Sequence, residues 1–180
     1  MRKELDEALC AKYPLIFRDR NENMQNTAMC WGFECGDGWY NIIDILCGKL
    51  GSEYYSAKSR YDFIKDRAGE KMYGNASGDI ITQGEIDLRK QIMDEEALKV
   101  PVAVQVKEKF GGLRFYVQGA TEKHWNYISF AESMSYRICE SCGAEGKTYT
   151  DGWHTTLCDI HAEMSGRTKE YQSDEDEGDE

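Results

Sequence analysis

The chain has 180 residues, 41% of them hydrophobic, and can therefore bury a core as one domain or as one domain with a small module. Its formal net charge of −11 counts against a nucleic-acid-binding protein, because such proteins usually carry a basic surface. The sequence has no run of about 18 apolar residues, the length that would indicate a membrane span. Its charged first residues do not resemble a secretory signal. We therefore expect a cytoplasmic protein with reduced thiols.

The first hundred residues are predicted to be mainly helical. Tyr13-Pro14 ends the first helix, because a residue that precedes proline avoids the helical region of backbone angles. Gly51 can close the second helix, whose apolar residues recur at helical spacing. Thr82 and Glu85 form a capping pair that begins the fourth. The expected helices cover residues 2–12, 39–50, 54–70 and 82–98.

A loop rich in glycine and aromatic residues, Cys30–Trp39, precedes the second helix. Glycine permits backbone angles that other residues resist, so we interpret this stretch as a structured loop in which Asp37 caps the helix. One interpretation is a tightly packed start of that helix. The other is a ligand pocket at Cys35, Asp37 and Trp39, because a helix N-terminus can hold an anion, although the carboxylate of Asp37 opposes one there.

Residues 102–118 are predicted to form a β-hairpin, because apolar and polar residues alternate on both sides of Gly111-Gly112. If these glycines make the turn, Glu108 falls on the apolar face, where a carboxylate needs a partner. That partner would be a cation from another element, unless Glu108 lies at the sheet edge. The same register places Lys109 opposite Arg114 and Lys107 opposite Tyr116.

The outer face of this hairpin is a candidate binding surface formed by Lys107, Lys109, Arg114 and Tyr116. Arginine grips phosphate with two donors, and tyrosine offers a flat surface for stacking. The face therefore suits a phosphate with an attached base. The alternative is an ordinary solvated face, which antiparallel sheets commonly have.

A helix over residues 121–136 is expected to follow, capped by Thr121. It leads directly into Cys139, so we expect the C-terminal segment to pack on the body instead of hanging from a linker. The predicted apolar stripe of this helix consists of Trp125, Ile128, Ala131 and Met134.

Two paired ligand motifs give the most specific signal in the chain: Cys139 with Cys142 and, after fifteen residues, Cys158 with His161. Zinc prefers four tetrahedral nitrogen and sulfur ligands, and two ligands separated by two residues can chelate it from one tight turn. Four protein ligands close the coordination sphere, so the predicted site is structural and not catalytic. His154 is an alternative fourth ligand, or an exposed hairpin residue.

The segment between the two pairs predicts a second hairpin, with Asp151-Gly152 as its two-residue turn. A short helix to about Glu163 follows. This order of paired cysteines, hairpin and ligand-bearing helix resembles a treble-clef zinc finger. A second metal site is left open at Cys30, Cys35 and Cys47, with Cys10 or His124 as the fourth ligand.

Two motifs, Gly32–Trp39 and Val106–Tyr116, followed by the cysteine pair at 139–142, resemble uncharacterised small zinc-finger-containing proteins encoded by tailed bacteriophages and prophages. The resemblance covers most of residues 28–162, and the first two motifs are the distinctive ones. The resemblance implies that the protein is the product of a phage accessory gene and is located in the cytoplasm of an infected bacterium. Products of such genes often inhibit host proteins or sequester host molecules. No catalytic residue is carried over from it.

The predicted fold class is α+β. We divide the chain into a helical and β-hairpin body (residues 1–137), a treble-clef-like zinc module packed on it (138–170), and a disordered acidic tail (171–180). The tail is predicted from composition, because its last seven residues hold no apolar side chain.

The leading function hypothesis is a non-enzymatic accessory protein that inhibits a host protein or sequesters an anionic small ligand such as a nucleotide. One alternative is a nucleic-acid-binding zinc protein that uses the zinc module and the basic hairpin face. The other is an enzyme that uses Cys35, His124 or Glu108, although no paired-acid, triad or phosphate-loop motif supports it.

Overall fold

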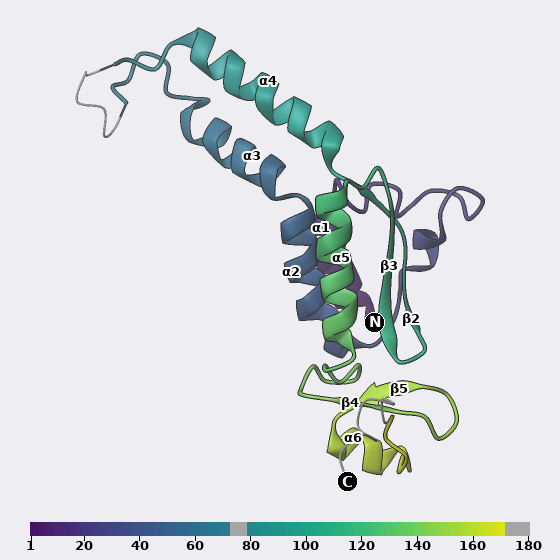
Figure 1. Cartoon of the computed structure of the whole chain (residues 1–180). Helices are drawn as coiled ribbons and strands as arrows, with labels where there is room; N and C mark the ends of the chain where they lie inside the picture. The colour runs from purple at the N-terminus through teal and green to yellow at the C-terminus, as the bar shows by residue number, and fades with distance from the viewer. Residues whose placement is uncertain (73–78, 172–180) are drawn as a thin grey trace.

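The computed structural model describes residues 1–72 and 79–171 and is a mixture of helices and sheet, which confirms the α+β class (Figure 1). The predicted acidic tail lies outside the described residues from position 172 onward. The helices are α1 (Lys3–Lys12), α2 (Tyr40–Leu50), α3 (Ser52–Ile64), α4 (Gln83–Lys99), α5 (Glu122–Ser135) and α6 (Asp159–Met164). The strands are β1 (Phe33–Glu34), β2 (Val102–Lys109), β3 (Gly112–Gln118), β4 (Lys147–Tyr149) and β5 (Thr155–Leu157). Two short 3-10 helices, η1 (Ala28–Trp31) and η2 (Asp37–Trp39), flank β1.

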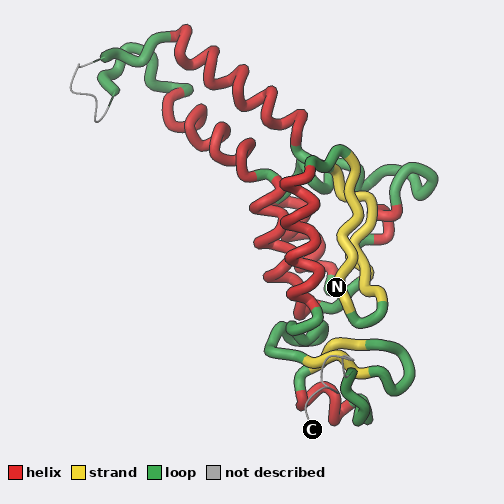
Figure 2. The backbone as a smooth tube through the Cα atoms, in the orientation of Figure 1, coloured by secondary structure: helices red, strands yellow, loops and turns green. Residues whose placement is uncertain are grey.

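The molecule has a central body with a projection at each end. In the body, α1, α2 and α5 lie beside a three-stranded sheet, and their apolar residues form one core with those of β2 and β3 (Figures 1 and 2). Helices α3 and α4 extend away from the body as a two-helix arm. The segment that carries β4, β5 and α6 lies at the opposite end.

The predicted helices of the first hundred residues are present, but α3 ends at Ile64 and not near residue 70. The chain beyond α3 turns back to pair with the segment before α4. Gly69 donates its N–H to the carbonyl of Ile81 (2.9 Å), and Met72 donates to Asp79 (2.9 Å). These backbone bonds, together with a small cluster of buried isoleucines, join α3 to α4 at the far end of the arm.

The sheet has the order β1-β2-β3, with β1 parallel and β3 antiparallel to β2. The predicted hairpin is present, but its turn lies one residue earlier than predicted, so each predicted cross-strand partner is wrong by two positions. Its turn is Phe110-Gly111, whose φ angles of 55° and 79° are both positive, as a type I′ turn requires. The observed pairs are Lys107 with Arg114, Lys109 with Gly112, and Gln105 with Tyr116.

Gly112 explains the error in register. A Cβ atom at this position would lie 2.4 Å from the ring of Tyr136, so the glycine provides room for that ring and not freedom for a turn. Phe110 takes the turn position in its place, although positive φ is uncommon for a residue with a side chain. The sequence shows the two glycines but not the ring that one of them must accommodate.

The buried face of α5 also differs from the predicted stripe. Ile128 and Ala131 are buried as expected, but Trp125 and Met134 are exposed. Two polar residues, His124 and Ser135, complete the buried face. Each is satisfied by backbone hydrogen bonds, because the Ser135 hydroxyl accepts from the N–H of Leu113 (2.8 Å) and His124 closes the capping box at the helix start.

Candidate metal centre

A tight turn brings the first two candidate ligands together. Cys139 donates its N–H to the carbonyl of Ala144 (2.7 Å) and accepts a bond from the N–H of Gly143 (2.8 Å). Gly143 has a φ of 81°, a conformation that residues with a side chain rarely adopt. This turn, closed by the pairing of Ile138 with Glu145, points both Cys139 and Cys142 toward one point.

The second ligand pair lies at the start of α6. Strands β4 and β5 form an antiparallel hairpin, and Cys158 follows directly as the N-cap of the helix. His161 lies within the helix, three residues later. The order of cysteine turn, hairpin and ligand-bearing helix is therefore present.

The predicted two-residue turn at Asp151-Gly152 is wrong, because residues 150–154 form a five-residue loop between β4 and β5. Asp151 instead binds the segment after α6, since its carboxylate accepts from the N–H of Thr168 (2.7 Å) and its carbonyl accepts from Arg167. These contacts tie the end of the described chain to the hairpin, and Glu170 extends this by pairing with Tyr149.

The four candidate ligands converge as a tetrahedral ion requires. Cys142 Sγ lies 3.8 Å from Cys158 Sγ, and His161 Nδ1 lies 3.6 Å from Cys139 Sγ and 3.1 Å from Cys158 Sγ. All four ligand atoms are within 4.8 Å of one another. A zinc ion bound at about 2.3 Å to sulfur and 2.0 Å to nitrogen would separate them by about 3.5–3.8 Å. The cluster can therefore hold one metal ion.

The electrostatic environment of the sulfurs favours a thiolate at the buried ligand. Burial of Cys139 opposes its ionisation, but the backbone N–H groups of Cys158, Cys142 and Ser141 donate to its sulfur and lower the pKa overall. Cys142 is exposed; the N–H of Ala144 lowers the pKa of its thiol, but desolvation and the neighbouring sulfurs of Cys139 and Cys158 together raise it overall. A bound cation would relieve this crowding of sulfurs.

His154 lies outside the ligand cluster. Its ring packs edge-on against Phe110 at the tip of the β2–β3 hairpin, with 6.3 Å between ring centres. Among the residues that the structure describes, Cys139, Cys142, Cys158 and His161 form the one group with metal-binding geometry. The described Cys30, Cys35, Cys47, Cys10 and His124 do not converge, so the structure gives no second cluster within its described part.

The loop predicted as a possible ligand pocket contacts the cysteine turn directly. Gly38 donates its N–H to the carbonyl of Glu140 (2.7 Å), and Gly36 donates to the Glu140 carboxylate (2.8 Å). A Cβ atom on Gly38 would lie 2.1 Å from the carbonyl oxygen of Cys139, so only glycine allows this approach. Trp39 is fully buried and donates its indole N–H to the carbonyl of Ile138 (2.9 Å).

The other candidate residues of this loop have structural partners. The prediction that Asp37 caps α2 with its side chain is wrong. Its carboxylate instead binds the guanidinium of Arg2 (2.5 Å) and accepts from the Arg2 N–H (2.6 Å). Cys35 is buried, and burial raises its pKa to about 12, which keeps the thiol protonated. Cys35 and Trp39 therefore expose almost no surface to a ligand in this conformation.

The tip of the β2–β3 hairpin forms a second contact with the segment 138–171. Thr156 donates its hydroxyl to the carbonyl of Gly111 (2.6 Å), and the indole N–H of Trp153 donates to Glu108 (3.3 Å). Glu108 also accepts from the N–H of Gly111 (2.7 Å). The prediction that Glu108 pairs with a cation is therefore wrong, because its carboxylate accepts hydrogen bonds from the two uncharged N–H groups of Gly111 and Trp153. The two distinctive sequence motifs both contact the metal-binding segment.

The residues of the predicted basic hairpin surface make different contacts. Lys107 and Arg114 are cross-strand neighbours, and the Lys107 ammonium lies 5.7 Å from the centre of the Tyr116 ring. Arg114 turns toward the metal-binding end, where it donates to the hydroxyl of Tyr136 (2.8 Å). Lys109 lies beside the ring of Phe110 (5.2 Å). Arg114 thus positions Tyr136, while both lysines remain at the surface.

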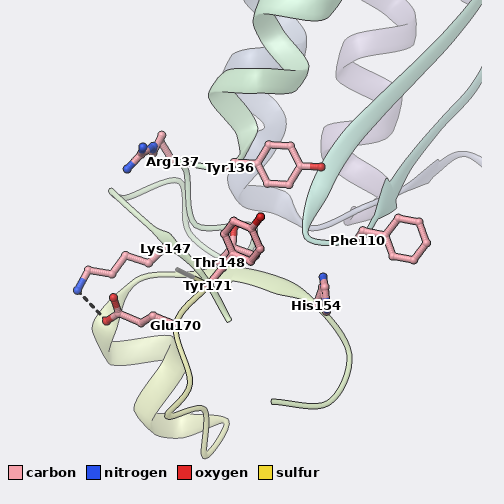
Figure 3. A pocket seen from close by; sticks show the side chains of 8 residues that line it. All are labelled: Phe110, Tyr136, Arg137, Lys147, Thr148, His154, Glu170 and Tyr171. Atoms are coloured by element: carbon pink, nitrogen blue, oxygen red, sulfur yellow. Dashed lines mark hydrogen bonds and ion pairs between the residues drawn. The ribbon is translucent and has the colours of Figure 1, made fainter. Parts of the chain in front are cut away.

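A groove of about 610 Å³ lies where the hairpin tip and the end of α5 meet the metal-binding segment (Figure 3). Aromatic rings line it from both sides, and two cations, Arg137 and Lys147, lie at one end. Lys147 is paired with Glu170 (2.9 Å). The exposed Arg137 forms no ion pair with any residue that the structure describes. The lining residues are Phe110, Tyr136, Arg137, Lys147, Thr148, His154, Glu170 and Tyr171.

The sequence analysis missed this groove. Its lining comes from the hairpin tip, the end of α5, the β4–β5 hairpin and the last described residues, which are far apart in the chain. Only the approach of these segments around the ligand cluster brings the side chains together. No local spacing could have indicated it.

No helix among the described residues has the length and apolar character needed to cross a membrane. No protein-family model matches the chain, and neither the curated proteins nor the solved structures gave a match.

Proposed function

We propose that this chain is a non-enzymatic, zinc-containing binding protein, and that its groove takes an anionic ligand with an aromatic ring, such as a nucleotide. Zinc is the metal that best suits three thiolates and one imidazole at these separations. With four protein ligands the coordination sphere is closed, so the ion would have a structural role. We assign residues 138–170 to a treble-clef-like module, supported by its order of cysteine turn, hairpin and helix.

The observation that carries the proposal is the composition of the groove. Its volume of about 610 Å³ is within the usual range for small-molecule sites. Tyr136 and Tyr171 come from opposite sides of the groove and offer flat surfaces to a base. Arg137 offers a guanidinium fork for phosphate, and it has no ion pair within the described residues that a ligand would need to break.

The hairpin face contributes to this site indirectly. Arg114 holds the Tyr136 hydroxyl, and Phe110 at the hairpin tip lines the end of the groove opposite Arg137 (Figure 3). We therefore assign the phosphate-and-base chemistry predicted for the hairpin to the groove. Because five of the eight lining residues belong to the metal-binding segment, ligand binding should require zinc.

Calorimetric titration of the zinc-loaded protein with ATP, AMP, adenosine and inorganic phosphate tests the proposal. We expect the nucleotides to bind more tightly than adenosine or phosphate alone. Arg137→Ser should weaken nucleotide binding at least about tenfold, because it removes a charged hydrogen-bond donor. Lys3→Ser is the matched control, since it removes an equal charge from an exposed site on α1.

Two results would contradict this assignment: no binding of any of the four probes, or equal binding by wild type and the Arg137→Ser variant. A labelled single-stranded 20-mer serves as a further probe. If it binds while the mononucleotides do not, the nucleic-acid-binding alternative replaces the proposal. The predicted phage context and host partner stay predictions.

A further inference from the structure

We infer that the metal centre is a redox switch, in which a peroxide oxidises Cys142 and Cys158 to a disulfide and the metal ion is released. This role rests on the zinc site of the proposed function and adds regulation to it. The oxidant is a peroxide from solution, and the two electrons come from the two cysteine sulfurs.

The sulfur ligands differ in their access to solvent. Of the seven cysteines, all of which the structure describes, Cys142 is the only exposed one. Cys158 is half-buried, and Cys139 is fully buried. A small oxidant attacks the sulfur that it can reach, so oxidation should begin at Cys142.

Zinc coordination also decides which thiols react. A thiol bound to zinc is deprotonated, and the thiolate is the form that attacks a peroxide. Outside the cluster, burial raises the pKa of Cys10 and Cys35 to about 12 and that of Cys47 well above its ordinary value. These three thiols stay protonated and react slowly. Oxidation should therefore concentrate at the metal centre.

The geometry selects Cys158 as the partner of Cys142. The two sulfurs lie 3.8 Å apart, so a disulfide bond of about 2.0 Å requires only a small approach. Cys142 belongs to the tight turn and Cys158 is the N-cap of α6, so neither lies inside a helix or strand. Pairing with Cys139 instead would give up the backbone N–H groups that donate to its buried sulfur.

The step balances as a two-electron oxidation. The Cys142 thiolate attacks one oxygen of hydrogen peroxide, the O–O bond breaks, hydroxide leaves, and a sulfenic acid forms. The Cys158 thiolate then attacks this sulfur, forms the S–S bond and displaces a second hydroxide. Two protons from solvent convert the hydroxides to water. The centre retains only Cys139 and His161, too few ligands to hold the ion.

The same step should control the ligand groove. Most of the groove lining lies in the segment that the metal centre organises, including Lys147 and Thr148 on β4. Oxidation should therefore weaken nucleotide binding, and a thiol reductant with added zinc should restore it, because disulfide formation is reversible.

Treatment of the reduced, zinc-containing wild-type chain with hydrogen peroxide tests the inference. A chromogenic chelator measures released zinc, and peptide mapping after alkylation identifies the oxidised cysteines. We expect zinc release to keep pace with formation of a disulfide between Cys142 and Cys158, while Cys139 is found alkylated. Dithiothreitol with added zinc should return the metal-bound protein.

Two variants sharpen the test. Cys142→His keeps a nitrogen ligand for zinc but removes the exposed sulfur, so peroxide should release zinc at least about tenfold more slowly. Cys30→Ser is the matched control, because it removes a half-buried thiol outside the cluster, and it should release zinc at the wild-type rate. If Cys142→His does not bind zinc, the wild-type peptide map decides alone.

Three results would overturn the inference: oxidised wild-type protein that keeps its zinc, a disulfide between any other two cysteines, or equal zinc release from wild type and a zinc-loaded Cys142→His variant. Reduced wild-type protein that contains no zinc would instead contradict the proposed function itself. The two failures are therefore distinguished before any peroxide is added.

Discussion

The metal-binding segment and the α3–α4 arm are both small projections from the body, but they complete their folds in different ways. Each has a cluster of only a few buried apolar residues, around Tyr149 in the first and Ile86 in the second. The metal-binding segment adds four converging ligands and two contacts with the body. The arm adds surface ion pairs and leaves an apolar groove exposed. Small regions need such additions, because burial alone gives them little stability.

The two regions also join the body differently. The metal-binding segment meets it through a backbone approach at Gly38 that leaves no space for a Cβ atom. The arm leaves α2 at Gly51, and returns before β2 at Val100-Pro101, where proline ends the helix. The first junction includes a backbone approach that only glycine permits, while the second combines two chain crossings with side-chain contacts, such as Tyr55 with Tyr13 (5.9 Å between ring centres) and Glu53 with Lys123. We therefore expect changes in one region to leave the other intact.

Metal removal should have the largest effect and should be confined to one region. Chelation, or Cys142→Ser, is expected to unfold residues 138–165, because metal binding supplies much of the folding free energy of such modules. Hydrogen exchange would detect this as fast exchange in β4, β5 and α6. Exchange in α3 and α4 should not change.

Cys30→Ser is the control, because Cys30 lies outside the ligand cluster and donates only to the carbonyl of Thr27 (3.2 Å). It should leave exchange in residues 138–165 as in wild type. Equal loss of protection in the arm after chelation would show that the two regions fold as one unit.

The second largest effect is expected at the junction of the body with the metal-binding segment. Gly38→Ala should destabilise the protein by about 1–3 kcal/mol, because the new methyl group overlaps the carbonyl of Cys139 and the N–H of Cys142. Gly84→Ala in the arm is the matched control, since nothing there lies closer than 4.0 Å. It should be neutral or stabilise α4 by up to about 1 kcal/mol. Urea denaturation of both variants measures the difference, and equal effects would contradict it.

A smaller effect is expected where the arm meets the body. His124 lies there beside Glu53 and Glu96, and burial lowers its pKa below the ordinary value. The unfolded chain therefore binds the proton more readily, and this contribution to stability is lost as the pH falls from about 6.5 toward the lowered pKa. His124→Gln keeps an N3 capping side chain and cannot titrate. Its stability should fall less than that of wild type between pH 7 and pH 5.

The smallest effect is expected from deleting residues 172–180. This segment contains no large apolar side chain and is mostly acidic, as in Asp174, Glu175, Asp176 and Glu177. Its removal should therefore change the melting temperature by no more than about 1 °C. Differential scanning fluorimetry of the full and shortened chains measures this. A decrease of several degrees would show that the segment packs on the protein.

The sequence predicted best what depends on local spacing. The cysteine and histidine pairs, the helix caps at Thr82 and Thr121, and the alternation of β2 and β3 each lie within a short window. Residues whose role is set by distant partners were predicted less well. Gly112 was taken as a turn residue because Tyr136, which requires it, lies 24 positions away. The buried Ser135 was missed because its partner is the N–H of Leu113.

The candidate site shows the same division. The four metal ligands follow from two local motifs, whereas the groove needs side chains from four separate segments. The Cys30–Trp39 loop was recognised as unusual, but both of its interpretations omitted what the structure shows there. Its glycines provide room for the cysteine turn, which begins more than a hundred residues later.

The most direct test of the account is native mass spectrometry of the protein purified without added metal. The mass should equal that of one chain, or of two chains for a dimer, plus one zinc ion per chain. Denaturing the same sample should release the zinc and show all seven cysteines in the reduced state. Native protein without metal would contradict the central claim that zinc completes the C-terminal module. Two zinc ions per chain would contradict the single site and direct attention to Cys30, Cys35 and Cys47.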